Sequence, residues 1–231
     1  MIQDKEYISR REKIKTKLAE LGADQFVATS SESIYYLCGA SYEALERPFF
    51  LIIPREGAER LVVPYLEKDH LKKARALSSE SIHTYWDFPA PPGKCWKSVM
   101  QEHGKLDKGF IYESSCPMTI AEQLIKLGGQ HMDLIEQLRM VKSPAEIEMI
   151  RVAAHYADMG VQQLFDWSYY GSTVAEGFAR SNKVTQSIIR NTPDWDALST
   201  KVIMATFPAP ISAQPHSIPA VDDLLLEGPH V

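Results

Sequence analysis

The spacing of apolar and polar residues predicts that helices and strands alternate through the first 130 residues. The first helix is expected from Asp4, its candidate N-cap, through an apolar face that ends with Leu21, and Gly22 stops it. Further helices are expected over 30–39, 66–76, 94–103 and 117–127, and strands over 25–28, 49–53, 60–63, 81–85 and 109–112. Strands that alternate with helices in this way indicate an α/β layer around a central sheet.

A change of pattern near residues 136–143 predicts a domain boundary. Ser143-Pro-Ala-Glu146 has the form of a capping box with proline at the first helical position. An apolar stripe continues behind it through residues 147–164. A second box, Thr173-Val-Ala-Glu176, predicts another helix towards Arg190. From Lys201 onward the chain is rich in proline and compatible with strands.

Composition narrows the class of protein. The 231 residues have a formal net charge of -5, and residues 144–231 carry that whole deficit, so no basic face is left for nucleic acid. Three widely spaced cysteines without a CxxC pair favour reduced thiols. The charged N-terminus lacks a signal sequence, and no window reaches the roughly 18 apolar residues of a membrane span. We therefore expect a soluble, cytoplasmic protein.

Common catalytic motifs do not occur in the chain. It has no phosphate loop, dinucleotide fingerprint, HExxH zinc helix or GxSxG elbow. No two histidines have the i, i+2 or i, i+4 spacing of a metal pair, and no set of three acids converges on a cation-binding spacing. Glu43 and Glu46 flank Arg47, a pattern typical of a solvated ion pair. We expect no metal site within these residues.

His216 is the strongest candidate for a functional side chain. It lies between Pro215 and Pro219, which restrict the backbone on both sides. Such rigid presentation suits an imidazole that positions substrate or transfers a proton. The alternative is a loop histidine with a structural hydrogen bond, and the local sequence leaves both interpretations open.

An ordered set of short motifs runs along the chain: Ile34-Tyr-Tyr-Leu-Cys-Gly39, Glu46-Arg-Pro48, Val63-Pro64, the junction from Leu138 to Ile150, Gly171-Ser-Thr-Val-Ala-Glu176, Pro215-His216 and Leu226-Glu-Gly228. This set resembles the creatinase/prolidase/aminopeptidase P family of "pita-bread" metallohydrolases. The resemblance implies a family-type N-terminal domain over 1–137, with a mixed central sheet flanked by helices. Residues 138–231 would be the first part of a pita-bread α+β domain, truncated before its metal ligands and exposing the 147–164 stripe.

The resemblance also implies a function. Family members use two divalent cations, often manganese, held by two aspartates, a histidine and two glutamates, to hydrolyse bonds next to proline. Only His216 matches a family site position, as a catalytic residue that contacts the substrate. A peptide or small amide substrate and a homodimer are implied, and this chain alone is expected to hold no metal and to be inactive. A creatinase-like hydrolase of a small amide and a non-catalytic pita-bread binding module remain the alternatives.

The histidine loop departs from the family pattern at two positions. Ser217 stands where the family commonly has glycine, and Gln214 where a small or apolar residue is frequent. Both differences bear on the shape of the loop and therefore on the substrate.

Overall fold

Ser143 and Pro144 mark the division of the chain into two units in the computed structural model, Met1–Ser143 and Pro144–Val231. The structure describes residues 2–43, 45–71, 74–87, 89–106, 109–193 and 195–227. Each unit has its own apolar core. The division lies at the end of the 136–143 stretch, while the proposed boundary after residue 137 stays a prediction.

The first helix, α1 (Asp4–Leu21), confirms the predicted element and corrects its start. Gln3 is the N-cap, without a side-chain hydrogen bond, and Asp4 is already helical, with its carboxylate 2.6 Å from the Arg75 guanidinium. Gly22 ends the helix as predicted, with a φ of 66° that glycine adopts without steric cost. Leu21, expected on the buried face, is 46% exposed.

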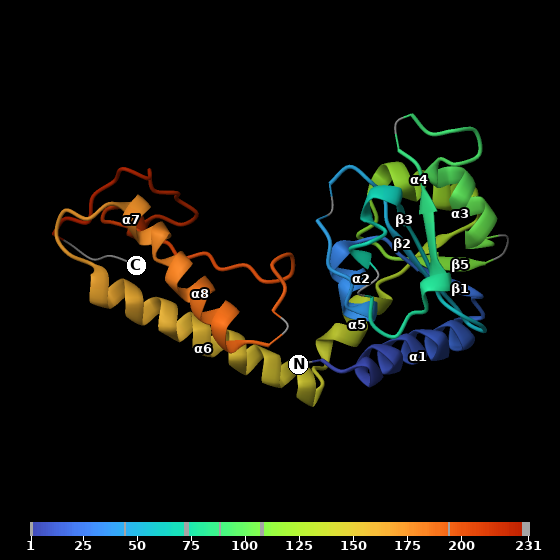
Figure 1. Ribbon diagram of the computed structural model, residues 1–231, viewed down its shortest axis with the longest axis horizontal. Helices are drawn as coiled ribbons and strands as arrows, with labels where there is room; N and C mark the ends of the chain where they lie inside the picture. The colour runs from blue at the N-terminus through green and yellow to red at the C-terminus, as the bar shows by residue number, and fades with distance from the viewer. Residues whose placement is uncertain are drawn as a thin grey trace. The chain divides into compact units, whose positions relative to one another are not determined.

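One six-stranded sheet forms the centre of the first unit (Figure 1). Its strands are β1 (Gln25–Ala28), β2 (Phe50–Pro54), β3 (Arg60–Pro64), β4 (Ile82–Tyr85), β5 (Phe110–Tyr112) and β6 (Gln130–His131), in the order β4-β3-β2-β1-β5-β6. Only β2 runs opposite to the others, since it pairs antiparallel with β1 and β3 and every other pair is parallel. The mixed sheet and the predicted β2–β3 hairpin are confirmed.

Helices cover both faces of this sheet because successive strand residues point to opposite sides. One core joins the side of Phe26 and Ile53 to α1, α2 (Ser31–Cys38) and α5 (Leu134–Met140). The other core joins the side of Val27 and Ile52 to α3 (Trp96–Gly104) and α4 (Met118–Lys126). Both strand faces are buried, as in α/β proteins with helices on each side.

The prediction of a helix over 66–76 is wrong. The structure describes residues 66–71 and 74–76 of this range. They contain a short 3-10 turn, Tyr65–Glu67, and no α-helix. Tertiary hydrogen bonds take up the backbone groups instead: the Arg75 amide donates to the Cys38 carbonyl at 2.6 Å, and Arg11 donates to the Ala76 carbonyl at 2.8 Å. Residues 72 and 73 lie outside the described residues.

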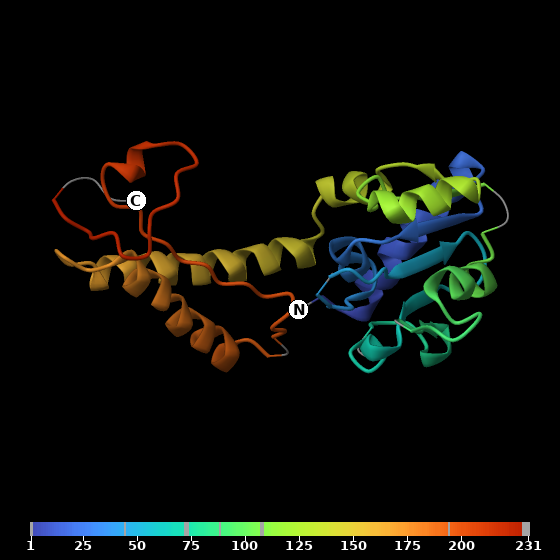
Figure 2. The same cartoon turned by 90° about the horizontal axis from the view of Figure 1, so that it is seen from above.

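The second unit contains α6 (Pro144–Trp167), α7 (Val174–Ala179) and α8 (Ser181–Asn191), which Figure 2 shows from above. The second of the two predicted capping boxes is confirmed, because the Thr173 hydroxyl accepts from the Glu176 amide and the Glu176 carboxylate accepts from the Thr173 amide. The single helix predicted towards Arg190 is in fact two helices with a break at Arg180. Their small core consists of Val184, Ile188 and Met204, with partly buried neighbours from α6.

The proline-rich tail, whose pattern is compatible with strands, forms no strand over the described residues 201–227. They form one 3-10 turn, Ile211–Ala213, and a single bridge between Thr173 and Leu224. Pro208, Pro210 and Pro215 each remove a backbone donor from this segment, which disfavours a continuous ladder. Gly228, the end of the last resembling motif, lies outside the described residues.

The predicted exposure of the α6 stripe is confirmed from Ile147 to Val161, whereas Leu164 at its end is partly buried against the small core. Ile147, Ile150 and Val161 are 40%, 54% and 52% exposed, and Gly160 is the buried residue of this helix. Exposed apolar side chains in one row favour association. No helix in the described part of the chain combines the length and apolar character needed to cross a membrane.

Candidate functional site

His216 lies on an exposed turn of the second unit. The Ser217 amide donates to the Gln214 carbonyl at 3.4 Å, and the Ser217 hydroxyl donates to the Gln214 side-chain oxygen at 3.0 Å. Pro215 takes the second position of this turn, and His216 takes the third with a φ of 58°. Proline followed by a positive φ is the pattern of a type II turn, so this backbone presents the imidazole outward. The catalytic role of His216 stays a prediction.

The sequence did not indicate the pairing of His83 with His103. His83 on β4 and His103 on α3 stack with ring centroids 3.9 Å apart and planes 10° from parallel. Across the described residues, no group of three or more histidine, cysteine, aspartate or glutamate side chains could hold a metal ion. The ring contact links β4 to α3.

This pair predicts a dependence of stability on pH. Burial lowers the pKa of His83, and the positive charges of His103 and Arg60 lower it further, against a smaller opposing effect of Glu102. Folding then favours neutral His83, so its contribution is complete above about pH 6.5 and declines as the pH falls towards the folded pKa. We expect the free energy of unfolding, measured by urea denaturation, to fall between pH 7.5 and 5.5 by less than about 1 kcal/mol, because the ring is partly exposed.

The matched variants His83→Asn and His131→Asn separate this effect from the general acid dependence. The first is expected to flatten the midpoint profile between pH 7.5 and 5.5, and the second, on an exposed residue, to leave it unchanged. Equal slopes in wild type and the His83 variant would contradict the assignment.

A cavity of about 570 Å³ lies at the carboxyl edge of the sheet. From β1 the chain enters α2 on one face, and from the neighbouring parallel strand β5 it enters α4 on the other face. The two connections diverge between adjacent strands, which is the topological switch point where open α/β sheets bind ligands. The wall residue Thr29 directly follows β1, and Pro117 precedes α4.

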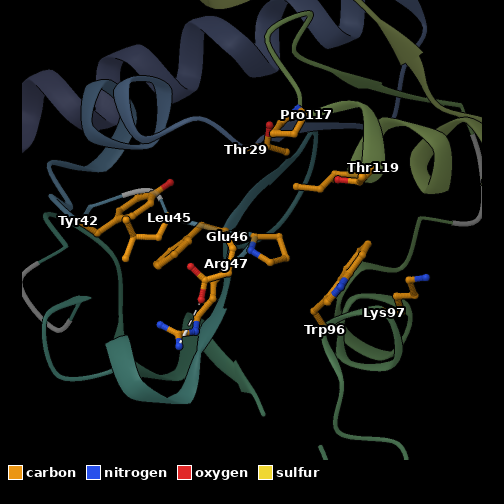
Figure 3. Close-up of a pocket in the computed structure, with 12 residues that line it drawn as sticks. Thr29, Tyr42, Leu45, Glu46, Arg47, Trp96, Lys97, Pro117 and Thr119 are labelled. Atoms are coloured by element: carbon orange, nitrogen blue, oxygen red, sulfur yellow. Dashed lines mark ion pairs between the residues drawn. The ribbon is translucent and has the colours of Figure 1, made fainter. Parts of the chain in front are cut away.

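The cavity wall combines apolar and polar side chains (Figure 3). Leu45, Pro48, Phe49, Trp96, Pro117 and Ile120 supply the apolar part, and Thr29, Tyr42, Glu46, Arg47, Lys97 and Thr119 the polar part. A cavity of this volume lies within the size range of small-molecule sites, although half of its lining residues are polar. The wall brings together segments separated by up to 91 positions in the sequence, 29 to 120.

Aromatic stacking fixes two sides of the cavity. Trp96 stacks on Phe50 of β2 with centroids 5.5 Å apart, and Tyr42 stacks on Phe49 at 3.7 Å. Phe50 is fully buried in the core, so it anchors the indole from behind. These walls are therefore formed before any ligand enters.

Two charged residues of the wall are already paired. The Arg47 guanidinium lies 3.0 Å from Asp87 and 3.5 Å from Glu46. The predicted Glu46–Arg47 ion pair is confirmed, with the Glu46 side chain 71% exposed. Lys97 makes no ion pair with any described residue and lies against its neighbour Trp96, its ammonium 5.6 Å from the ring centroid.

The hydroxyl of Tyr42 is buried and has no hydrogen-bond partner among the described residues. The residue is 6% exposed, and Figure 3 shows the hydroxyl turned towards the side on which Thr29 lies. Burial raises the pKa of Tyr42 far above its ordinary value, and the nearby Glu113 carboxyl adds to this. The group therefore remains a protonated donor in need of an acceptor.

Below the cavity, the Glu113 side chain joins the ends of β1 and β5. Its Oε1 accepts from the amides of Thr29 and Ser30 and from the Thr29 hydroxyl at 2.8 Å. Its Oε2 accepts from the Ser30 hydroxyl at 3.2 Å. Glu113 is fully buried, so these bonds fix the loop from β1 into α2 that carries Thr29.

Residues 10–141 match the family profile of the creatinase/prolidase N-terminal domain, and the chain belongs to that family. Two curated relatives from Staphylococcus aureus, strains RF122 / ET3-1 and USA300, both described as uncharacterized peptidases, are 28% identical over 214 residues. The match covers 90% of this chain and 56% of each relative. The chain thus spans little more than half the length of the relatives it matches.

Solved structures share this fold. A dipeptidase PepE from Mycobacterium ulcerans aligns with a TM-score of 0.72 and 23% identity over 97% of this chain and 58% of that one. A prolidase from Pyrococcus horikoshii OT3 aligns with a TM-score of 0.68 and 21% identity over 95% and 58%. The fold class inferred from the motifs for the first unit, a creatinase/prolidase-type N-terminal domain with a mixed sheet flanked by helices, is confirmed.

Proposed function

We propose that this chain is the N-terminal domain and the opening helices of an Xaa-Pro dipeptidase or aminopeptidase P-like metallopeptidase. The family match over residues 10–141 carries the proposal, and the peptidase descriptions of the curated relatives support it. Peptides with proline after the scissile bond are the substrates, and the active form is a homodimer. Its three free cysteines fit a reducing cytoplasm.

The proposed activity requires metal ions that the described residues do not fit. No three suitable side chains converge in the described ranges between 2 and 227. We infer that the two divalent cations, manganese in this proposal, are held by aspartates, a histidine and glutamates of a longer protein. His216 would contribute substrate contact, since its turn presents the imidazole at the surface.

The coding sequence after codon 231 tests the proposal most directly. Two aspartates, a histidine and two glutamates on the following predicted strands would support it. A stop codon at that point, or an extension without these residue types, would overturn the assignment of a dinuclear peptidase.

Hydrolysis by the 231-residue chain is a second test. With manganese and a Leu-Pro dipeptide we expect no proline release above the metal-only blank, measured by chromatography. The extended protein is expected to release proline, and His216→Ala in it to lower kcat/KM by about 10²-fold through lost substrate positioning. Robust turnover by the short chain would contradict the proposed location of the metal ligands.

A further inference from the structure

A second, smaller pocket lies at the other edge of the sheet from the cavity, where β1 and β3 begin and the antiparallel strand β2 ends. Its volume is about 300 Å³, at the lower end of the range of small-molecule sites. Five of its seven lining residues are charged: Asp24, Arg55, Glu56, Arg60 and Lys105. The pocket therefore suits a polar, charged ligand.

Arg60, the first residue of β3, contributes a partly buried cation to this pocket. Both hydrogen bonds that its guanidinium donates to described residues leave from Nη2, to the Gln25 side-chain oxygen and to the Gly104 carbonyl at 3.2 Å. Its Nε is buried and has no hydrogen-bond partner among the described residues. Burial lowers the pKa of Arg60, and no described carboxylate opposes this effect. The charge of Arg60 therefore lacks a counterion, which an anion in the pocket would supply.

Gln25 fixes the position of the Arg60 guanidinium. The Gln25 side chain is buried; its oxygen accepts from Arg60, and its Nε2 donates to the Lys105 carbonyl at 2.7 Å. These two bonds connect the start of β3 to the end of α3. Because the guanidinium is held before a ligand enters, binding costs less conformational entropy.

The remaining charges of the pocket differ in how far they are compensated. Arg55 is paired with Asp24 at 3.0 Å. Lys105, directly after α3, is exposed and makes no ion pair with any described residue. Glu56, the other acid, is exposed and equally without an ion pair in the described part of the chain. Arg60 and Lys105 thus leave two uncompensated cations on separate elements.

We propose that this pocket binds a phosphate group, either as the free anion or carried by a small polar molecule. Arginine binds phosphate oxygens through its planar fork, and lysine binds them as a point charge. Two cations on separate elements suit a dianion whose oxygens point in several directions better than a planar carboxylate with one charge. The pocket contains no residue of the proposed peptidase site, so the proposal does not depend on hydrolysis.

Calorimetric titration of the 231-residue chain with inorganic phosphate tests the proposal. At about pH 8, where phosphate is a dianion, we expect one site with a Kd of about 0.1–1 mM. Acetate carries one charge and is expected to bind at least about tenfold more weakly. Glycerol 3-phosphate distinguishes the two sources of the group: binding about tenfold tighter than inorganic phosphate indicates a phosphomonoester, and equal binding indicates the free anion.

Exposed variants connect the affinity to the charges of the pocket. Lys105→Gln is expected to weaken phosphate binding about tenfold, since it removes one of the two uncompensated cations. Glu56→Gln is expected to tighten it about threefold, because it removes a repelling charge. Lys126→Gln and Glu122→Gln make the same changes on the exposed side of α4, outside the pocket, and should bind like wild type.

Arg60 variants test the fork itself. Arg60→Gln is expected to abolish measurable binding, and Arg60→Lys, which keeps the charge without the fork, to weaken it about tenfold. Because Arg60 also donates to the end of α3, the urea midpoint of each variant is measured beside its affinity. Should Arg60→Gln fail to fold, Lys105→Gln and Glu56→Gln still decide the question.

Three results would overturn the proposal. The first is no heat of binding at about 10 mM phosphate, a concentration about tenfold above the expected Kd range. The second is acetate binding as tightly as phosphate. The third is equal affinity in the Lys105→Gln and Lys126→Gln variants, or weaker binding in Glu56→Gln. None of these measurements involves the metal centre, so failure of this site is distinguishable from failure of the proposed function.

Discussion

Glu113→Ala is expected to destabilise the first unit by about 4 kcal/mol. The substitution removes the acceptor of the Thr29 and Ser30 amides and of both hydroxyls at the β1–α2 connection. Buried donors left without an acceptor cost about 1–3 kcal/mol each, and the missing side chain adds a cavity. Urea dependence of hydrogen exchange at the Val27 and Tyr112 amides measures the change where β1 pairs with β5.

Two comparison variants define this result. Glu113→Gln keeps Oε1 as an acceptor and is expected to cost less than half as much as the alanine variant. Glu122→Ala, exposed on α4, is expected to stay within about 0.5 kcal/mol of wild type. If Glu113→Ala matched Glu122→Ala, the carboxyl bridge would contribute nothing to the fold.

Arg11→Met is expected to cost about 3 kcal/mol, the second largest effect. The guanidinium is almost fully buried and donates at 2.8 Å to the carbonyls of Leu37 and Ala76. It thereby joins the end of α2 to the irregular segment at 74–76. Its Nε lies 3.3 Å from Glu59 without hydrogen-bond geometry. Methionine preserves apolar volume but leaves two carbonyls and one carboxylate without this partner.

The Glu59 carboxylate gives this prediction a second measurement. Burial raises the pKa of Glu59, but its own backbone amide, Arg11 and Lys15 together hold the pKa below its usual range. Folding then favours the ionised form, so its contribution is present above the unfolded pKa and is lost as the pH falls through the folded pKa. Arg11→Met is expected to shift this loss to higher pH, as urea midpoints between pH 3 and 6 would show.

Two further variants in α1 serve as controls. Arg11→Lys can reach only one of the two carbonyls well and is expected to recover less than half of the loss. Lys17→Met, on the exposed side of α1, is expected to change stability by less than about 0.5 kcal/mol. A shift in Lys17→Met equal to that in Arg11→Met would point to a general effect of charge.

Local signals located most of the secondary structure. Gly22 and Gly39 end helices with positive φ, and the Thr173–Glu176 box begins α7, because each depends on neighbours within one turn. The 66–76 segment and the break at Arg180 were mispredicted. In the first, hydrogen bonds to residues 11 and 38 outweigh helix propensity. For the break at Arg180, the sequence contains no local signal that would predict it.

The His216 turn and the cavity also differ in how far the sequence could predict them. His216 could be singled out because its restraint comes from two adjacent prolines. The cavity could not, because Thr29, Tyr42, Trp96 and Lys97 carry no motif, and Trp96 and Lys97 belonged simply to a predicted helix. An unpartnered tyrosine hydroxyl and a lysine without an acid are properties of packed neighbours. No spacing of residues in the sequence could have predicted these two properties.

The amino-acid sequence by itself determined the alternating elements, the place where the chain changes character and the family. Those properties follow from apolar periodicity, caps and short motifs that act over a few residues. The tertiary structure alone decided that β1 and β5 are neighbours whose connections leave on opposite faces. The cavity and the Glu113 bridge follow from that neighbourhood, because the pairing of β1 with β5 brings together Thr29 and Glu113, which are 84 positions apart in the sequence.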